Sequence, residues 1–187
     1  MTTSARQSTP RMTVSEFLVW AETQLDGRYE LVDGYVVAMA PELIRHNRAK
    51  SAAYMTLRSG IQKAKLPCEV FTDGLGVSTS ERHFRIPDTT VQCGIAADPD
   101  ATMVEPIIIV EILSPSTEKN DVGAKFVEYW TLASLRHYLI VDPVSRFAIH
   151  HSRDDAGDIH TRIVRNGPIT FTPPGFSIAS EDLFVET

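Results

Sequence analysis

The sequence predicts an α/β protein in which a mixed β-sheet is flanked by helices. Residues 106–114 form a short run rich in β-branched residues, which is typical of a strand buried on both faces of a sheet. Residues 107–141 have strand–helix–strand order, which predicts a right-handed parallel crossover. Asp33-Gly34 is a strong two-residue turn signal, so antiparallel strands are expected as well.

The N-terminal part of the chain predicts a helix and a β-hairpin added before the main sheet. Residues 1–11 are polar and lack periodicity, so we expect a disordered tail. Thr13 and Glu16 have the spacing of a capping box, which predicts a helix over residues 14–24. The hairpin is expected over residues 29–39, and its alternation puts Glu30 on an otherwise apolar face.

A long helix is predicted over residues 41–66, because Pro67 ends the pattern. His46 lies near its start, and we interpret it as a packing or capping residue, with a role in a site as the second interpretation. The basic residues of this helix fall on two different sides (Arg45, Arg48 and Lys63; Lys50, Arg58 and Lys65). This scatter favours a solvated helix over a surface that binds phosphates.

Strands dominate the segment that follows this helix. One or two are expected over residues 69–80, with a break at Asp73-Gly74. The next covers residues 84–93 and contains Pro87, which has no amide hydrogen to donate. The central strand comes after a polar loop.

The C-terminal part begins with a helix capped by Ser116 or Thr117, which is expected to run to about residue 132. A buried strand at residues 137–143 and a hairpin of residues 147–151 and 159–164 come next. His150 and His151 are interpreted as surface residues of that hairpin. No repeat or composition break marks a second domain, so residues 12–187 are expected to form a single one.

Composition narrows the possible functions. The chain has 187 residues and a formal net charge of −6, which argues against a protein that coats nucleic acid non-specifically, although a local groove stays compatible with it. No apolar run is long enough to cross a bilayer, and no signal peptide is visible. Cys68 and Cys93 lack metal-ligand spacing, so we expect two buried thiols in a reducing cytoplasm.

Two carboxylates from neighbouring predicted strands are the best candidates for chemistry. Asp88 starts one strand and Glu111 sits late in the next, so they converge at one end of the sheet if the strands pair. Mg²⁺ and Mn²⁺ prefer oxygen ligands of this kind, and Lys125 on the following helix is within reach of such a site.

Each of these residues also has a purely structural interpretation. Glu111 can be a buried acid satisfied by hydrogen bonds, and Asp88 after a proline can be a turn residue. Asp121 and Lys125 have the spacing of a surface ion pair, and Glu30 can face solvent.

An ordered set of residues resembles the Uma family of bacterial endonucleases. It comprises Arg-Ile-Pro-Asp ending at Asp88, Val-Glu-Ile-Leu-Ser-Pro-Ser-Thr over residues 110–117, Lys125 and Tyr129, and Tyr-Leu-Ile-Val-Asp-Pro over residues 138–143. Residues 29–34 and His46 match the family's N-terminal half. The family belongs to the PD-(D/E)XK restriction-endonuclease-like superfamily, so the resemblance implies a restriction-endonuclease-like mixed sheet flanked by helices.

The resemblance also implies a catalytic site of Glu30, Asp88, Glu111 and Lys125. Asp88 and Glu111 would bind Mg²⁺ or Mn²⁺, and Glu30 would be an additional acidic residue that binds the metal or positions water. The superfamily usually has its lysine two residues after the glutamate, where this chain has Leu113. Lys125 on the following helix would take that role.

The expected function is a metal-dependent endonuclease that hydrolyses phosphodiester bonds of nucleic acid, with DNA as the expected substrate. A homodimer is compatible with this function, because many nucleases cut both strands. The main alternative is a non-catalytic member of the same fold that binds nucleic acid or a protein. A phosphohydrolase acting on a small molecule is a third, weaker hypothesis.

Overall fold

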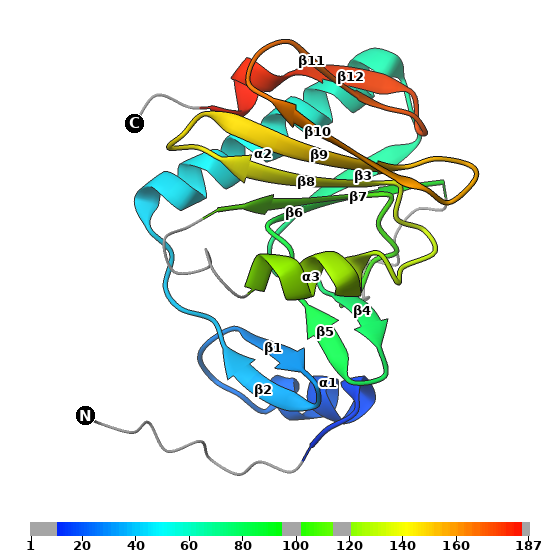
Figure 1. Ribbon diagram of the computed structural model, residues 1–187. Coiled ribbons are helices and arrows are strands. Elements are labelled where there is room, and N and C mark those ends of the chain that lie inside the picture. The colour runs from blue at the N-terminus through cyan, green and yellow to red at the C-terminus, as the bar shows by residue number, and fades with distance from the viewer. Residues whose placement is uncertain (1–10, 95–101, 114–120, 185–187) are drawn as a thin grey trace.

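The largest of the three sheets in the described residues forms the centre of the protein. The computed structural model describes residues 11–94, 102–113 and 121–184 (Figure 1). Within them, this sheet has the strand order β10-β9-β8-β7-β6-β3. Its strands are β3 (Cys68–Thr72), β6 (Thr89–Cys93), β7 (Ile108–Ile112), β8 (His137–Asp142), β9 (Phe147–Arg153) and β10 (Ile159–Val164). β7 pairs antiparallel with β6 and parallel with β8, so the prediction of a mixed sheet around this strand is confirmed.

The smaller sheet combines the N-terminal hairpin with a second hairpin from the middle of the chain. Its order is β2-β1-β5-β4, from β1 (Tyr29–Val32), β2 (Tyr35–Ala38), β4 (Val77–Ser80) and β5 (His83–Arg85). Asp33 and Gly34 both have positive φ, at 50° and 79°, as the predicted two-residue turn requires. Helix α1 (Val14–Glu22) packs on this sheet and begins with the predicted capping box.

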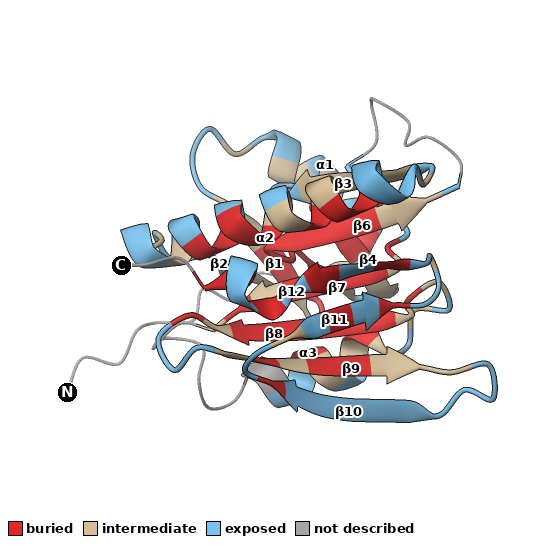
Figure 2. Ribbon diagram, turned by 90° about the horizontal axis from the view of Figure 1, so that it is seen from above, coloured by how far each residue is buried: buried red, intermediate tan, exposed pale blue. Residues whose placement is uncertain are grey.

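Helices cover both faces of the larger sheet. α2 (Ile44–Ala64) packs on one face, where Leu57 contacts the same core as Ile108 and Val110 of β7. α3 (Asp121–Tyr129) packs on the other face, where Tyr129 joins the core that contains Ile109. Figure 2 shows the buried residues concentrated on β6, β7, β8 and the inner side of α2, whereas β10 is largely exposed.

The C-terminal segment adds a two-stranded sheet of β11 (Pro168–Phe171) and β12 (Phe176–Ala179), followed by the 3₁₀ helix η1 (Ser180–Leu183). Phe171 and Ile178 belong to the same core as α2 and the larger sheet. The residues predicted to cap α3, Ser116 and Thr117, lie outside the described residues. No helix within the described ranges has the length and apolar character needed to cross a membrane.

The predictions on the strand of residues 84–93, on the two cysteines and on the histidine pair were wrong. Residues 84–93 do not form one strand, because β5 ends at Arg85 and belongs to the smaller sheet whereas β6 begins at Thr89 in the larger one. Pro87 lies in this gap and cannot donate to a ladder, which explains the change of sheet.

The cysteines and the histidine pair account for the other two corrections. Cys68 and Cys93 are direct partners across β3 and β6 and form a disulfide, so they are not free thiols. The expectation of a reducing cytoplasm, drawn from the absence of metal-ligand spacing, is not supported by this disulfide. His150 and His151 are buried, at 5% and 9% exposure, because both faces of β9 are covered.

Candidate active site

A cavity of about 340 Å³ lies where the N-terminal end of α2 meets the β1–β2 hairpin and the ends of β6 and β7. Its lining includes all four residues that the sequence analysis named, Glu30, Asp88, Glu111 and Lys125, together with His46. These side chains come from both sheets, from α2 and from α3. The cavity is therefore the candidate site.

Strand pairing brings Asp88 and Glu111 to the same place. Thr89 pairs with Val110, so the next step in this antiparallel register sets Asp88 opposite Glu111. Asp88 also accepts a hydrogen bond on Oδ2 from the backbone N–H of Ile112, at 2.7 Å. This bond fixes the Asp88 carboxylate at the end of β7, although Pro87 has ended the regular ladder.

Glu111 points to the α3 side of the sheet, where two donors hold it. Lys125 Nζ lies 3.1 Å and the Tyr129 hydroxyl 2.6 Å from Glu111 Oε1. Burial raises the pKa of Glu111 to about 7; Lys125 and Tyr129 oppose this shift, and Asp88 and Glu30 reinforce it. Burial and Glu111 raise the pKa of Tyr129, so its hydroxyl keeps its proton and acts as a donor. Lys125 is buried here, and the surface-pair interpretation is wrong for it.

Glu30 is held from the smaller sheet and does not face solvent, since it is only 6% exposed. It accepts hydrogen bonds from the backbone N–H of Ile86 at 3.0 Å and from Arg85 Nη1 at 2.9 Å. Arg85 also binds Glu128 of α3 through two of its nitrogens, at 2.7 and 2.8 Å. Lys125 Nζ lies 3.9 Å from Glu30, so this lysine connects Glu30 to Glu111.

A second group of charges lies on the α2 side of the cavity, and the sequence analysis missed most of it. Lys50 is 3% exposed, which contradicts the expectation of a solvated helix. Its ammonium lies 2.5 Å from Glu42, 3.0 Å from Asp73 and 3.6 Å from Asp88. His46 Nε2 lies 3.1 Å from Asp88 Oδ1. Glu42, His46 and Lys50 are spaced four residues apart, which would put them on one face of the predicted helix over residues 41–66 and is the signal that could have revealed them.

The site has more carboxylates than cations among the described residues. On the α3 side, three carboxylates meet two cations (Glu30, Glu111 and Glu128; Arg85 and Lys125). On the α2 side, three carboxylates again meet two cations (Glu42, Asp73 and Asp88; Arg28 and Lys50). Charges of one sign in partly buried positions raise each other's energy, so this excess favours binding of a further cation.

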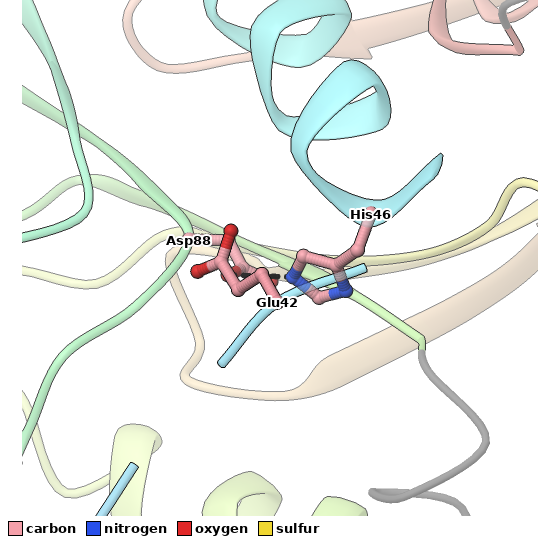
Figure 3. Close-up of side chains that lie close together, drawn as sticks. All are labelled: Glu42, His46 and Asp88. Atoms are coloured by element: carbon pink, nitrogen blue, oxygen red, sulfur yellow. Dashed lines mark hydrogen bonds and ion pairs between the residues drawn. The ribbon is translucent and has the colours of Figure 1, made fainter. Parts of the chain in front are cut away.

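The potential metal ligands differ in how close their donor atoms lie to one another. In the part of the chain that the structure describes, one group of three donor atoms lies within 4.8 Å of one another, and it consists of Glu42, His46 and Asp88 (Figure 3). The expected ligand set of Asp88, Glu111 and Glu30 lines the same cavity without forming such a group. Asp88 is common to both sets.

The central mixed sheet with a helix on each face has the restriction-endonuclease-like fold. A model of the Uma2 family, described as "Putative restriction endonuclease", matches residues 14–181, and the chain belongs to this family. The resemblance noted in the sequence is thus confirmed.

The chain is also similar to two further proteins and to one solved structure. Two uncharacterised proteins of Synechocystis sp. are similar to the chain: one is 30% identical over 154 residues, covering 78% of this chain and 77% of that protein. The other is 28% identical over 152 residues, covering 78% and 83%. The crystal structure of "a putative nuclease" from Anabaena variabilis has a TM-score of 0.73 and 17% identity, and the match covers 92% of this chain and 97% of that one. This last likeness concerns the fold alone.

Proposed function

We propose that the chain is an endonuclease that hydrolyses phosphodiester bonds of DNA with the help of Mg²⁺ or Mn²⁺. The observation that carries this proposal is the cavity in which Glu30, Asp88, Glu111 and Lys125 meet within a member of a restriction endonuclease family. The excess of carboxylates over cations around this cavity fits a divalent ion and is costly without one.

Asp88 and Glu111 would hold the ion, and Glu30 would complete the acidic set. A divalent ion bound there supplies Lewis-acid chemistry for the attack of water on a phosphodiester. Asp88 is pre-oriented by its hydrogen bond from Ile112, and Glu111 by its contacts with Lys125 and Tyr129. Both carboxylates therefore need little reorganisation on binding.

Lys125 is the residue we assign to charge compensation and to the orientation of water. Its ammonium lies between Glu111 and Glu30, at 3.1 and 3.9 Å, so it is held at the edge of the acidic set and faces the cavity. A cation at this position can offset negative charge that develops on a phosphate. In this chain, Lys125 would take the role of the lysine that the superfamily usually has at the position of Leu113.

The decisive experiment is cleavage of plasmid and single-stranded DNA in the presence of Mg²⁺ or Mn²⁺. We expect Glu111→Gln and Asp88→Asn to lower the cleavage rate on the order of 100-fold or more, because each removes a charged group needed in the transition state. Glu69→Gln, the same chemical change on the exposed face of β3, is the matched control and should cut at the wild-type rate.

Activity of both variants at the wild-type level would refute the assignment of the site. Absence of cleavage by the wild-type protein on either DNA, with DNA binding retained, would favour the alternative of a non-catalytic binding protein. Circular dichroism of each variant separates loss of the site from loss of the fold.

A further inference from the structure

The strongest unexplained feature is the cluster of Glu42, His46 and Asp88, which the proposed nuclease chemistry uses only in part. Glu42 precedes α2, His46 lies in its first turn, and Asp88 lies just before β6. Figure 3 shows the imidazole of His46 and the two carboxylates turned toward one another. All three residues line the cavity, so an ion entering it can reach them.

We propose that Glu42, His46 and Asp88 form a divalent-cation site with mixed nitrogen and oxygen ligands, and that the Lys50 ammonium, which shares Glu42 with Arg28, competes with the metal ion for these ligands. The site is separate from the pair of Asp88 and Glu111 and shares only Asp88 with it. The proposal rests on the proposed function only in that both use Asp88, because cation binding at Glu42 and His46 does not depend on DNA cleavage.

The types of ligand indicate the class of metal. Donor atoms of the three residues lie within 4.8 Å of one another, and His46 Nε2 is 3.1 Å from Asp88 Oδ1. Imidazole nitrogen is a good ligand for first-row transition metals such as Fe²⁺, Ni²⁺ and Zn²⁺, with Mn²⁺ the weakest binder of that series, whereas Mg²⁺ is usually bound by oxygen and water. The site should therefore select transition metals over Mg²⁺.

Lys50 shows that this position already attracts a cation. Its ammonium is buried and lies 2.5 Å from Glu42 and 3.6 Å from Asp88, so it contacts two of the three proposed ligands. Asp73, 3.0 Å away, gives Lys50 a carboxylate partner that is not one of the ligands. Lys50 can thus keep a counter-charge when Glu42 and Asp88 bind a metal ion.

Binding of Mn²⁺ alone to the full chain, without nucleic acid, tests the proposal. The protein is labelled with ¹⁵N-histidine, and electron paramagnetic resonance measures both affinity and nitrogen coupling. We expect one histidine nitrogen to couple to bound Mn²⁺. We expect His46→Gln to abolish this coupling, and both His46→Gln and Glu42→Gln to weaken affinity about 10-fold or more.

Two further variants sharpen the test. Lys50→Met should bind Mn²⁺ more tightly than wild type, because it removes the competing ammonium and leaves the carboxylates in place. His160→Gln, on exposed β10, is the matched control and should keep both the coupling and the affinity.

The outcomes separate this proposal from the nuclease proposal. Mn²⁺ bound through oxygen only, coupling that survives in His46→Gln, or no Mn²⁺ binding at all would each overturn the mixed-ligand site. A protein that binds Mn²⁺ through His46 and cuts no DNA keeps this site and loses the nuclease. A protein that cuts DNA with Mg²⁺ but shows no nitrogen coupling to Mn²⁺ keeps the nuclease proposal and overturns the mixed-ligand site.

Discussion

At the scale of single residues, the site depends on side chains that orient the carboxylates as much as on the carboxylates themselves. The Tyr129 hydroxyl donates to Glu111 Oε1 at 2.6 Å, and its ring is completely buried in the core beneath α3. The same oxygen receives the Lys125 ammonium. Glu111 is thereby held from one side, and its orientation depends on the packing of α3 against β7 and β8.

Tyr129→Phe should separate this positioning role from packing. The ring stays in place, but Glu111 loses a donor that lowers its pKa, so more of it is protonated near neutral pH. We expect DNA cleavage to fall by roughly 10- to 100-fold and the acid side of its pH–rate profile to move to higher pH. Steady-state rates between pH 6 and 9 provide the measurement, with Tyr54→Phe on α2 as the matched control. A wild-type pH profile in Tyr129→Phe would contradict the positioning role.

Some residues of the site could be predicted from the sequence and others could not, and the difference has a physical reason. Glu111 stands out because it interrupts an apolar strand, where a charge needs an explanation, and Asp88 stands out because it starts the neighbouring predicted strand. Lys50 is one of several basic residues on a long helix, and nothing nearby in the sequence shows that it is buried. Its partner Asp73 comes from the end of β3, so only the tertiary fold brings them together.

At the scale of elements, the strongly patterned segments were predicted well. The errors occur where tertiary contacts determine which sheet a strand joins or whether it is buried. The buried run of β7, the Asp33-Gly34 hairpin and the capping box of α1 were visible because each depends on local sequence. The division of residues 84–93 between two sheets was not, because both halves have strand character. The strands β11 and β12 were missed, because their burial depends on contact with distant α2.

The pairing of β8 with β9 buries two histidines whose protonation should control stability. His137 Nε2 donates to the carbonyl of Pro173 at 2.8 Å, because that oxygen can only accept. His137 Nδ1 is then left to accept from His150 Nε2, 3.0 Å away. Burial lowers the pKa of His137 to about 4 and that of His150 to about 3, so both are neutral in the folded protein.

Protonation therefore favours the unfolded chain, in which histidine has a pKa near 6.5. The stabilisation is complete above about pH 6.5 and is lost as the pH falls toward 4. Each of the two histidines contributes a loss on the order of 2 kcal/mol, so we expect the free energy of unfolding to drop by about 4 kcal/mol between pH 7 and pH 5. His150→Gln should reduce this drop, whereas His160→Gln, at an exposed position of β10, should leave it unchanged. Urea denaturation at the two pH values gives the measurement, and an equal drop in all three proteins would contradict the assignment to this pair.

At the scale of the whole molecule, the site exists because the chain leaves the larger sheet and returns to it. β3 belongs to the larger sheet, β4 and β5 build half of the smaller one, and β6 returns to pair with β3 (Figure 1). This excursion carries Asp73, Arg85 and Asp88, which contact residues of α2, β1 and α3 around the cavity. The relative position of the two sheets therefore determines whether the two halves of the site meet.

The disulfide between Cys68 and Cys93 closes this excursion at its base, across a separation of 25 residues. A ring of this size lowers the entropy of the unfolded chain, so the cross-link should stabilise the fold by about 3 kcal/mol. We expect Cys68→Ser/Cys93→Ser to lose this amount in guanidinium denaturation, and the reduced wild-type protein to unfold like the double variant. DNA cleavage under native conditions should persist, because the cysteines do not line the cavity. Identical unfolding curves with and without reductant would show that the cross-link contributes nothing to stability, and the closure of the two-sheet excursion would then rest on the pairing of β3 with β6 alone.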